Sequence, residues 1–537
     1  MAGWSLTDDD SASGPLVSIF TATHEIGPEI NTAYRSLLRQ SYPHWEWVVV
    51  DDSRDVETAE HIERLAASPD ADGRIRCYRQ LPPPGSIGAT KAAAGALCRG
   101  EYLIELDHDD ELMPEAVETV AATFGAHPDI DFVFSDWIDW IDQPDGYGFP
   151  GLFPEGWAFG YGAYASEMLA GRRVPVALAP PLTWDTIRHI VSTPNHVRAW
   201  RRTFYDHVGG HNYRLPIADD YELVIRSFLN GMTARIPRPL YIQHHGTRGP
   251  SASRRQNEEI QERVGQLAAH YESALDWRCI EFGLSPRSPE GRSRWSSSSP
   301  VNAASALIDV EAEAAADLGT PLISVVIPTF ERPDLLRRAI ESVLDQRYAN
   351  FEILVVGDRC PCVDNVVAKI EDPRLRHANL SEHHGDLGAT PRNFALKAMA
   401  RGTLIAYLDD DNEWTPEHLE SLLELLLSNP LAAFAFSSFE VGGEVIECRS
   451  PRRFQIDTSA LLHQRWLLER FGYWREPAEA DWAHDWELVS RWTDEPWVAS
   501  LRPTLRYTLE TSHQTREVVA HMRAVADNER AHGRSAR

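Results

Sequence analysis

The sequence lacks several features that would place the protein in other classes. Its longest apolar runs, such as "LISVVI", are far shorter than the roughly 20 residues that a transmembrane helix needs. The first residues, "MAGWSLTDDDSASG", are acidic and polar and do not resemble a secretion signal. We therefore expect no transmembrane segment and a cytoplasmic location, peripheral to a membrane only through what the protein acts on.

Basic charge and cysteine are also scarce. The chain has 52 Lys and Arg against 80 Asp and Glu, a formal net charge of −28, which argues against binding to nucleic acid or to an anionic membrane. Six cysteines occur, and the only close pair, Cys360 and Cys362, has a C-P-C spacing that fits neither a zinc knuckle nor a C-x-x-C redox pair. A reducing cytoplasm is the simplest location for such a chain.

The 537 residues predict two or more domains, and the chain repeats itself. Six matches occur in the same order in both halves: "LVSIFTATHE" with "LISVVIPTFE", "HWEWVVVDDSRD" with "NFEILVVGDRCP", "GAT" with "GAT", "RG" with "RG", the aspartate clusters at Asp107 and Asp409, and "IADDYELVIR" with "WAHDWELVSR". We therefore predict a first domain over 14–283, a Ser- and Pro-rich linker over 284–319 and a second domain over 320–537.

Each copy alternates strand-like and helix-like segments. In the first copy "VSIFTA", "WEWVVVDD" and "YLIELD" are apolar on both faces, and "PEINTAYRSLLRQ" and "ETAEHIERLAAS" have helical spacing. The second copy repeats this order, and further helices are expected over 254–277 and 308–318. The pattern predicts an α/β fold in each copy, with a mostly parallel sheet flanked by helices. Ligands bind such sheets outside the carboxyl ends of the strands, where every motif of interest falls.

Carboxylates follow equivalent strands in the two copies. Residues i and i+2 of an extended chain point the same way, so Asp107 with Asp109, and Asp409 with Asp411, can face one site. Two hard oxygen ligands with open positions suit Mg²⁺ or Mn²⁺, completed by water and substrate phosphates. The alternative is a solvated acidic turn or helix cap, which two matching clusters make less attractive.

Four further aspartates have two interpretations each. Asp52 and Asp358 end strands, where they can cap the next helix or accept an N–H group from a bound base. Asp220 and Asp485 begin apolar helical runs, where the helix dipole favours acidic residues and where a general base could face a cleft.

Taken together and in order, these motifs resemble two tandem family-2 glycosyltransferase domains of the GT-A fold. The quoted segments are "PTFER" and the looser "ATHEI", "DDSR" and "GDRC", "GATPRN" and the altered "GATKAA", the two D-x-D clusters, and "DDYEL" and "HDWEL". The resemblance covers most of both halves, but neither the linker nor the termini. It implies an enzyme that moves a sugar from a nucleotide-diphosphate donor, with a UDP-sugar expected first, to an acceptor hydroxyl with inversion.

The resemblance also implies a role for each matching residue. The metal would be held by Asp107 and Asp109, and by Asp409 and Asp411; the nucleotide pocket would be lined by Thr23, Glu25 and Asp52, and by Thr329, Glu331 and Asp358; Lys91 and Arg392 would approach the diphosphate; and Asp220 and Asp485 would be the catalytic bases. The family often adds a His on a late strand, for which the first copy offers His244 and His245, with His245 taken as the ligand. The second copy has only the more distant His513.

The copies depart from the family pattern at a few positions. Gly357 stands where the first copy has Asp51, and His484 stands where the family often has Glu. The first copy also has a longer stretch between cluster and base, rich in aromatics and glycines over 136–167, with a smaller counterpart over 466–482. There we place an acceptor, which would be a sugar, lipid-linked, natural-product or protein hydroxyl; the alternative is an aromatic mini-core under a long loop.

Three rival hypotheses remain. One copy could be catalytically silent and serve as an acceptor-binding scaffold. Nucleotidyl transfer would favour a Gly-rich basic loop near the first strand, and neither "TATHEIGPE" nor "PTFERPD" is one. A calcium-dependent binding module would need more oxygen ligands in each cluster than two carboxylates supply.

Overall fold

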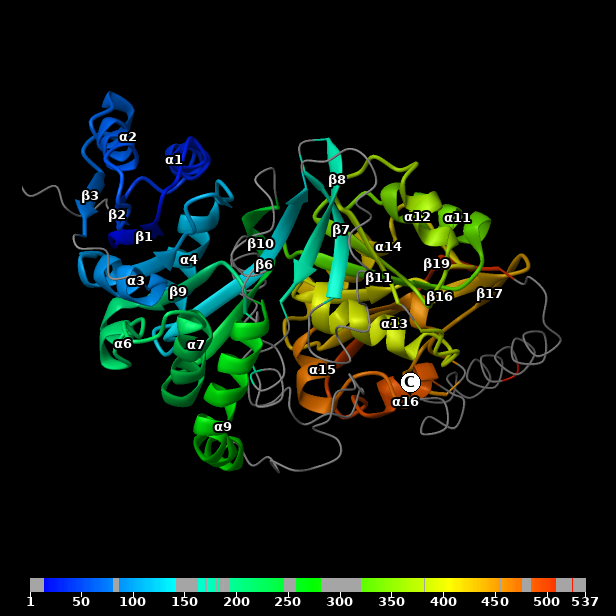
Figure 1. Cartoon of the computed structure of the whole chain (residues 1–537). Coiled ribbons are helices and arrows are strands. Elements are labelled where there is room, and N and C mark those ends of the chain that lie inside the picture. The colour runs from blue at the N-terminus through cyan, green and yellow to red at the C-terminus, as the bar shows by residue number, and fades with distance from the viewer. Residues whose placement is uncertain are drawn as a thin grey trace, which may run out of the picture.

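The computed structural model describes residues 14–80, 86–141, 163–169, 171–179, 194–245, 257–281, 320–380, 382–453, 455–475 and 484–508, with single residues at 182, 187 and 524. Within these ranges the chain forms two α/β lobes that follow one another along the sequence (Figure 1). The predicted linker, with the helix expected over 308–318, lies outside the described residues, so the predicted domain boundaries stay a prediction.

The first copy contains the following strands and helices: β1 (Val17–Thr23), α1 (Ile30–Leu38), β2 (Trp45–Asp51), α2 (Glu57–Ala66), β3 (Ile75–Arg79), α3 (Ile87–Ala96), β4 (Tyr102–Glu105), β5 (Glu111–Leu112), α4 (Ala116–Ala126), β6 (Phe132–Ile141), β7 (Ala163–Leu169), β8 (Arg172–Leu178), β9 (Arg198–Arg201), α6 (Arg202–His207), α7 (Asp219–Asn230), β10 (Thr233–His245) and α9 (Asn257–Glu281). The strands β3, β2, β1 and β4 lie side by side and parallel. The strand β9 is antiparallel between β4 and β6, and β10 lies parallel to β6 with β5 at its edge.

The second copy contains β11 (Ile323–Thr329), α11 (Pro333–Leu344), β12 (Phe351–Gly357), α12 (Cys362–Val367), β13 (Leu375–Asn379), α13 (Ala389–Phe394), β14 (Leu404–Tyr407), β15 (Glu413–Trp414), α14 (His418–Ser428), β16 (Phe434–Val441), β17 (Glu444–Ile446), β18 (Leu461–Gln464), α15 (Trp466–Phe471), α16 (His484–Ser490) and β19 (Trp497–Tyr507). Its sheet repeats the first: β13, β12, β11 and β14 are parallel, β18 is antiparallel between β14 and β16, and β19 is parallel to β16 with β15 beside it. The predicted repeat and the mostly parallel α/β fold are confirmed.

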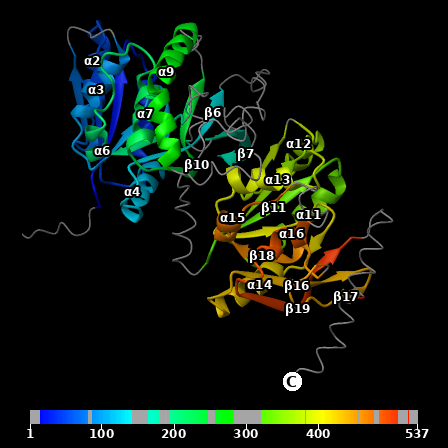
Figure 2. The same ribbon diagram turned by 90° about the horizontal axis from the view of Figure 1, so that it is seen from below.

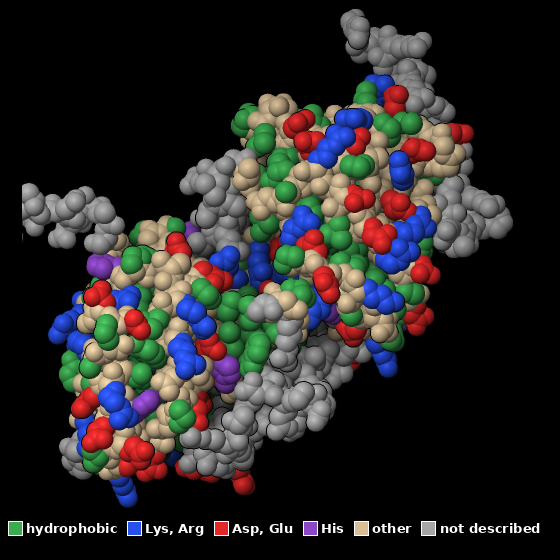
Figure 3. Space-filling model, turned by 90° about the horizontal axis from the view of Figure 1, so that it is seen from above, with side chains coloured by type: hydrophobic (Ala, Val, Ile, Leu, Met, Phe, Trp, Pro, Cys, Tyr) green, Lys and Arg blue, Asp and Glu red, His purple; other side chains and the backbone are tan. Residues whose placement is uncertain are grey.

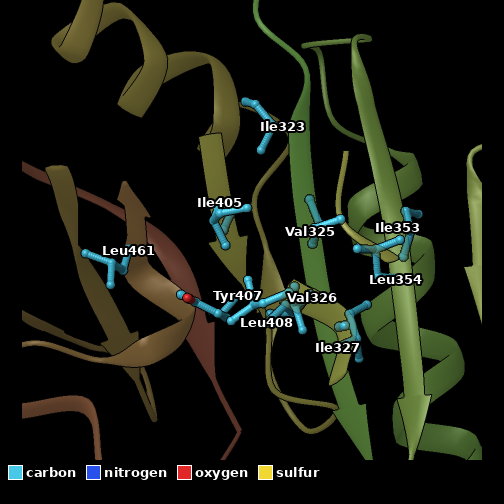
Figure 4. Packing of buried hydrophobic residues seen from close by; sticks show 14 of the residues in the cluster. Ile323, Val325, Val326, Ile327, Ile353, Leu354, Ile405, Tyr407, Leu408 and Leu461 are labelled. Carbon is cyan, nitrogen blue, oxygen red and sulfur yellow. The ribbon is translucent and has the colours of Figure 1, made fainter. Parts of the chain in front are cut away.

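The buried sides of these elements follow from the sequence pattern. All seven residues of β11 are buried, as expected for a strand covered by helices on both faces. The helix α11 begins with Pro333 in its first turn and buries Leu336, Ala339, Ile340 and Val343, which recur at helical spacing. Figure 4 shows part of the resulting core, in which Val326 of β11 lies beside Tyr407 of β14 and Leu408.

A β-hairpin of the first copy joins the two sheets into one. The strand β8 pairs antiparallel with β6, β7 pairs with β8, and Ser166 of β7 lies opposite His377 of β13 in the second copy. Figures 1 and 2 show β7 between the two lobes. Five apolar residues from β6 and the hairpin are buried in the core of the second copy: Ile138, Ala165, Val174, Val176 and Leu178. The hairpin therefore completes the neighbouring copy and covers an otherwise open strand edge.

Buried charges secure this junction. The carboxylate of Glu167 in β7 accepts hydrogen bonds from Arg376 at 2.9 Å and from Arg401 at 2.8 Å. Lys and Arg side chains are also visible where the two lobes meet in the space-filling view (Figure 3). The described ends of the segment 136–167 are thus strands of the junction. Residues 142–162 lie outside the described residues, so the acceptor expected over 136–167 stays a prediction.

Two further sequence expectations concern cysteine and membranes. Cys360 and Cys362, whose C-P-C spacing fits neither a zinc knuckle nor a C-x-x-C redox pair, form a disulfide with Cα atoms 5.3 Å apart. Cys77, Cys98 and Cys448 are described as thiols outside any disulfide. In the part of the chain that the structure describes, no helix combines the length and the apolar character needed to span a bilayer.

Candidate active sites

In both copies the predicted residues gather where parallel strands end. The N–H of Asp52 donates to the carbonyl of Thr23 at 3.1 Å, and the N–H of Asp358 donates to the carbonyl of Thr329 at 2.9 Å. These bonds tie the end of the second strand to the end of the first. All four side chains are buried, at 2–6% exposure, so they shape the floor of each site.

The next residues share an uncommon backbone conformation. Glu25 and Glu331 have φ angles of +47° and +52°, in the left-handed region that costs a non-glycine residue about 1–2 kcal/mol. Their N–H groups donate to the side chains of Ser53 and Cys360, respectively. Backbone strain of this kind clusters at functional sites, and both copies carry it at the same place.

In the first copy the cluster carboxylate lies beside a buried cation. The carboxylate of Asp107 lies 3.5 Å from Lys91 Nζ and 3.2 Å from His196 Nε2. Lys91 also binds Glu105 at 2.5 Å. Burial favours a raised pKa for Asp107, but Lys91 and then His196 outweigh it, so its pKa is lowered. Asp109 is 51% exposed and open to a ligand.

In the second copy an arginine takes the equivalent place. Arg392 donates to Asp409 at 2.5 Å, and Arg332 binds Asp411 at 2.9 Å. Asp410 accepts from the Thr329 hydroxyl at 2.7 Å and from Arg332 at 3.2 Å. Burial, then the charges of Asp409 and Asp410, raise the pKa of Asp411 to about 6. Such crowding of carboxylates is relieved by a bound cation.

These donor sets fit a divalent cation that shares its coordination with substrate. Each cluster offers two carboxylates at 31–51% side-chain exposure. Among the described residues no group of three or more His, Cys, Asp or Glu side chains is arranged to hold a metal. A cation held by two carboxylates would complete its coordination with water and substrate phosphate oxygens, which is how Mg²⁺ is commonly bound.

The late histidines are only partly described. His244 Nε2 lies 2.9 Å from Glu111, and the His244 N–H donates to Asp110, so its ring is engaged on the far side of the cluster. The side chain of His245 lies outside the described residues, and its metal role stays a prediction. The N–H of Thr508 donates to Asn412 in the second copy, which places Thr508 where the first copy has His244. His513 lies outside the described residues.

The two predicted bases have different partners. Asp220 lies in the first turn of α7 and accepts from Arg198 at 3.1 Å. Burial alone would raise its pKa, but Arg198 and Lys91 lower it. Asp485 lies in the first turn of α16 and accepts from the hydroxyl of Thr458. Burial raises the pKa of Asp485 to about 6. The hydrogen bond from Thr458 opposes this rise, and the charge of Asp409 adds to it.

The way the strands pair explains why the two predicted bases have different partners. Glu105 lies opposite Arg198 where β4 meets β9. The pairing of Ala406 with Leu462 puts Tyr407 and Leu461 at the equivalent positions of the second copy. In Figure 4 the Tyr407 hydroxyl points toward the strand that carries Leu461. The first copy thus holds its base with a buried charged pair, where the second has an aromatic and a leucine.

Sequence reasoning missed the residues that support the bases: His196, Arg198, Asp457 and Thr458. They precede or begin the antiparallel strands β9 and β18, and match no family motif. One signal was available, because Glu105 interrupts the apolar strand "YLIELD" and a buried carboxylate needs a cationic partner. Nothing in the sequence named Arg198 as that partner.

Comparisons with known proteins agree with these motifs. The chain is 28% identical to the O-antigen biosynthesis protein RfbC of Myxococcus xanthus over 76% of this chain and 28% of RfbC. It is 34% identical to UDP-Glc:alpha-D-GlcNAc-diphosphoundecaprenol beta-1,3-glucosyltransferase WfgD of Escherichia coli over 22% of this chain and 46% of WfgD. The chain therefore spans less than half the length of either relative.

Among solved structures, S. aureus TarS 1–349 in complex with UDP-GlcNAc covers 50% of this chain and 73% of its own, with 19% identity and a TM-score of 0.35. The family model "Glycosyl transferase family 2" matches residues 18–151 and 324–479, one segment in each copy and together more than half of the chain. The predicted glycosyltransferase family is confirmed in both copies, and the chain belongs to glycosyl transferase family 2.

Proposed function

We propose that the protein is a metal-dependent, inverting glycosyltransferase with a nucleotide-sugar donor site in each copy. The observation that carries the proposal is the closeness of base and cluster. Lys91 and Arg198 both influence the pKa of Asp107 and that of Asp220. In the second copy the charge of Asp409 raises the pKa of Asp485. One bound substrate could therefore touch cluster and base together in either copy.

The proposed reaction uses the base carboxylate as proton acceptor. Asp220 or Asp485 would take the proton of an acceptor hydroxyl while the oxygen of that hydroxyl forms a bond to the anomeric carbon of the donor sugar. The bond from that carbon to the diphosphate breaks on the opposite face, and the nucleoside diphosphate leaves with the electron pair. A divalent cation held by the cluster would offset the charge on the leaving group. Lys91 and Arg392, which each contact the first cluster carboxylate, would stabilise the same charge.

The relatives support a class of substrates. The name of WfgD gives it a UDP-glucose donor and a diphosphoundecaprenol-linked acceptor, and RfbC is named for O-antigen biosynthesis. We propose a UDP-sugar as the first donor to test and a growing glycan, lipid-linked or otherwise, as the acceptor. A lipid-linked acceptor would bring the enzyme to the membrane surface.

A second candidate is one working copy and one silent copy. The observation that favours it is the ion pair between Arg198 and Asp220, because a carboxylate held by a buried guanidinium is a weaker proton acceptor. In this version the first copy would bind donor or acceptor and only the second would transfer.

The test is sugar transfer from UDP-, GDP- and dTDP-sugars in the presence of Mn²⁺ or Mg²⁺, with EDTA as the control. We expect turnover of at least one donor, loss of turnover with EDTA, restoration by excess cation, and a product of inverted anomeric configuration by NMR. Turnover that survives complete chelation would remove the metal from the proposal. A retained configuration would remove the direct displacement.

A further inference from the structure

The carboxylates proposed to bind the nucleotide base are held by different donors in the two copies. In the first, His24 Nδ1 donates to Asp52 at 2.7 Å, and the Thr90 hydroxyl donates to its other oxygen at 2.9 Å. In the second, Asp358 accepts the backbone N–H groups of His384 and Gly385, each at 2.9 Å. His383 Nδ1 lies 3.0 Å from the same carboxylate. The two pockets therefore share an aspartate but not its surroundings.

The ring beside the aspartate also differs. His24 and Phe330 both directly follow the buried threonine that ends the first strand of their copy. The Phe330 ring stacks on the ring of His383, with centroids 4.1 Å apart and planes 22° apart. Phe330 is 38% exposed, so an apolar ring face is available beside Asp358. The His24 side chain is 57% exposed but is tied to Asp52, and its free edge is polar.

The loops that supply these donors have the same length but different chemistry. Arg79 and Asn379 end equivalent strands, and Gly88 and Gly388 follow them at the same spacing. Between them the second copy has "SEHHG" and the first has "LPPPG", so Pro84 matches His384. Residues 81–85 lie outside the described residues, but proline has no backbone N–H in any conformation. Pro84 therefore cannot supply the backbone N–H that His384 donates to Asp358.

We propose that the two donor pockets select different nucleotide bases, with His24 as the determinant in the first copy and the Phe330–His383 pair in the second. This inference rests on the proposed function and adds that the two copies use different donors. Asp52 accepts from the His24 Nδ1–H, so the edge of the His24 ring that carries Nε2 is the polar edge left for the base.

The second pocket instead combines a carboxylate with an aromatic platform. A base stacked on an aromatic side chain gains binding energy, and every base has a face that can stack in this way. The bicyclic ring of guanine covers more of this platform than the single ring of uracil does. The ratio of GDP to UDP affinity is therefore expected to be higher at the second pocket than at the first, by about tenfold.

The test is calorimetric titration of the full-length protein with UDP and with GDP in the presence of Mg²⁺. Asp358→Ala isolates the first pocket and Asp52→Ala isolates the second. Phe330→His in the Asp52→Ala background should lower the GDP-to-UDP affinity ratio of the second pocket, and His24→Phe in the Asp358→Ala background should raise that of the first. His270→Phe, an exposed histidine on α9, is the matched control and should change neither ratio.

Each outcome has a distinct meaning. The proposal is supported if the GDP-to-UDP affinity ratios of the two pockets differ and if His24→Phe and Phe330→His shift them in the stated directions. Equal ratios at the two pockets, or ratios that both exchanges leave unchanged, overturn it while leaving two nucleotide sites in place. Failure of the unaltered protein to bind either nucleotide would instead overturn the proposed function. If an aspartate variant loses its thermal unfolding transition, the two ratios are obtained from the two-site titration of the unaltered protein and of its single ring variants.

Discussion

At the scale of single residues, the two copies solve the same problem with different side chains. Each keeps the carboxylate that we propose as the base in place at the first turn of a helix. The first copy uses Arg198, whose positive charge is compensated by Glu105. The side chains of Arg198 and Glu105 are both buried. The second copy uses the hydroxyl of Thr458 and places Asp457 nearby, which adds negative rather than positive charge.

This difference predicts two acid limits for activity. A base must be ionised to accept a proton, and the pKa of Asp485 is raised to about 6 while that of Asp220 is lowered. In Asp220→Asn, where only the second base remains, kcat/KM should fall as the pH drops through about 6. In Asp485→Asn the activity should persist to lower pH. The profiles are recorded at saturating Mn²⁺, since Asp411 also has a raised pKa; superimposable acid limbs would count against the two assignments.

The Arg198 pair predicts a large stability effect. Replacing Arg198 by leucine, the residue of the second copy, leaves Glu105 buried with Lys91 as its remaining close cation. Loss of one partner of a buried pair typically costs about 3–5 kcal/mol of unfolding free energy. Urea unfolding should show such a loss for Arg198→Leu and a partial recovery when Glu105→Gln is added. A single variant as stable as the unaltered protein would mean that this pair is solvated.

At the scale of elements, the periodic segments could be predicted and the junction could not. The strands β1, β2, β11 and β12 are apolar on both faces, and α1 and α11 have clear helical spacing, so local pattern identifies them. The hairpin β7–β8 has no such signal. Its "AYASEML" strand contains Glu167, and the carboxylate of Glu167 is compensated at the junction by two arginines of the other copy.

The hairpin is therefore expected to depend on Glu167. The side chain of Arg376 is only 2% exposed, and Glu167→Ala leaves it with Glu352 as its remaining carboxylate partner. The same substitution removes one partner of Arg401. We expect a loss of about 3 kcal/mol in unfolding free energy, and a smaller loss for Glu167→Gln, which keeps hydrogen bonding. Denaturant unfolding measures both, and Glu424→Ala on the exposed side of α14 is the control. A loss no larger than that of the control would show that this cluster contributes little.

At the scale of the whole molecule, two copies of one fold form a single continuous sheet. The duplicated motifs predict two sites, because the cluster, the strand-ending aspartate and the helix-start aspartate recur in order. The order alone does not reveal that a piece of the first copy lies in the core of the second, since this depends on contacts between residues about 200 positions apart. Nor does it reveal the supports of the bases, which lie in the segment where the copies differ most.

The central claim is that each copy has its own donor site and its own base. The most direct measurement is product analysis for the unaltered protein, Asp220→Asn, Asp485→Asn and the double variant, with one donor panel and one acceptor. Two working sites predict that each single variant loses a different transfer step and that the double variant loses both. If Asp485→Asn abolishes all transfer and Asp220→Asn none, only the second copy catalyses. If neither substitution affects any transfer, the assignment of the bases is contradicted.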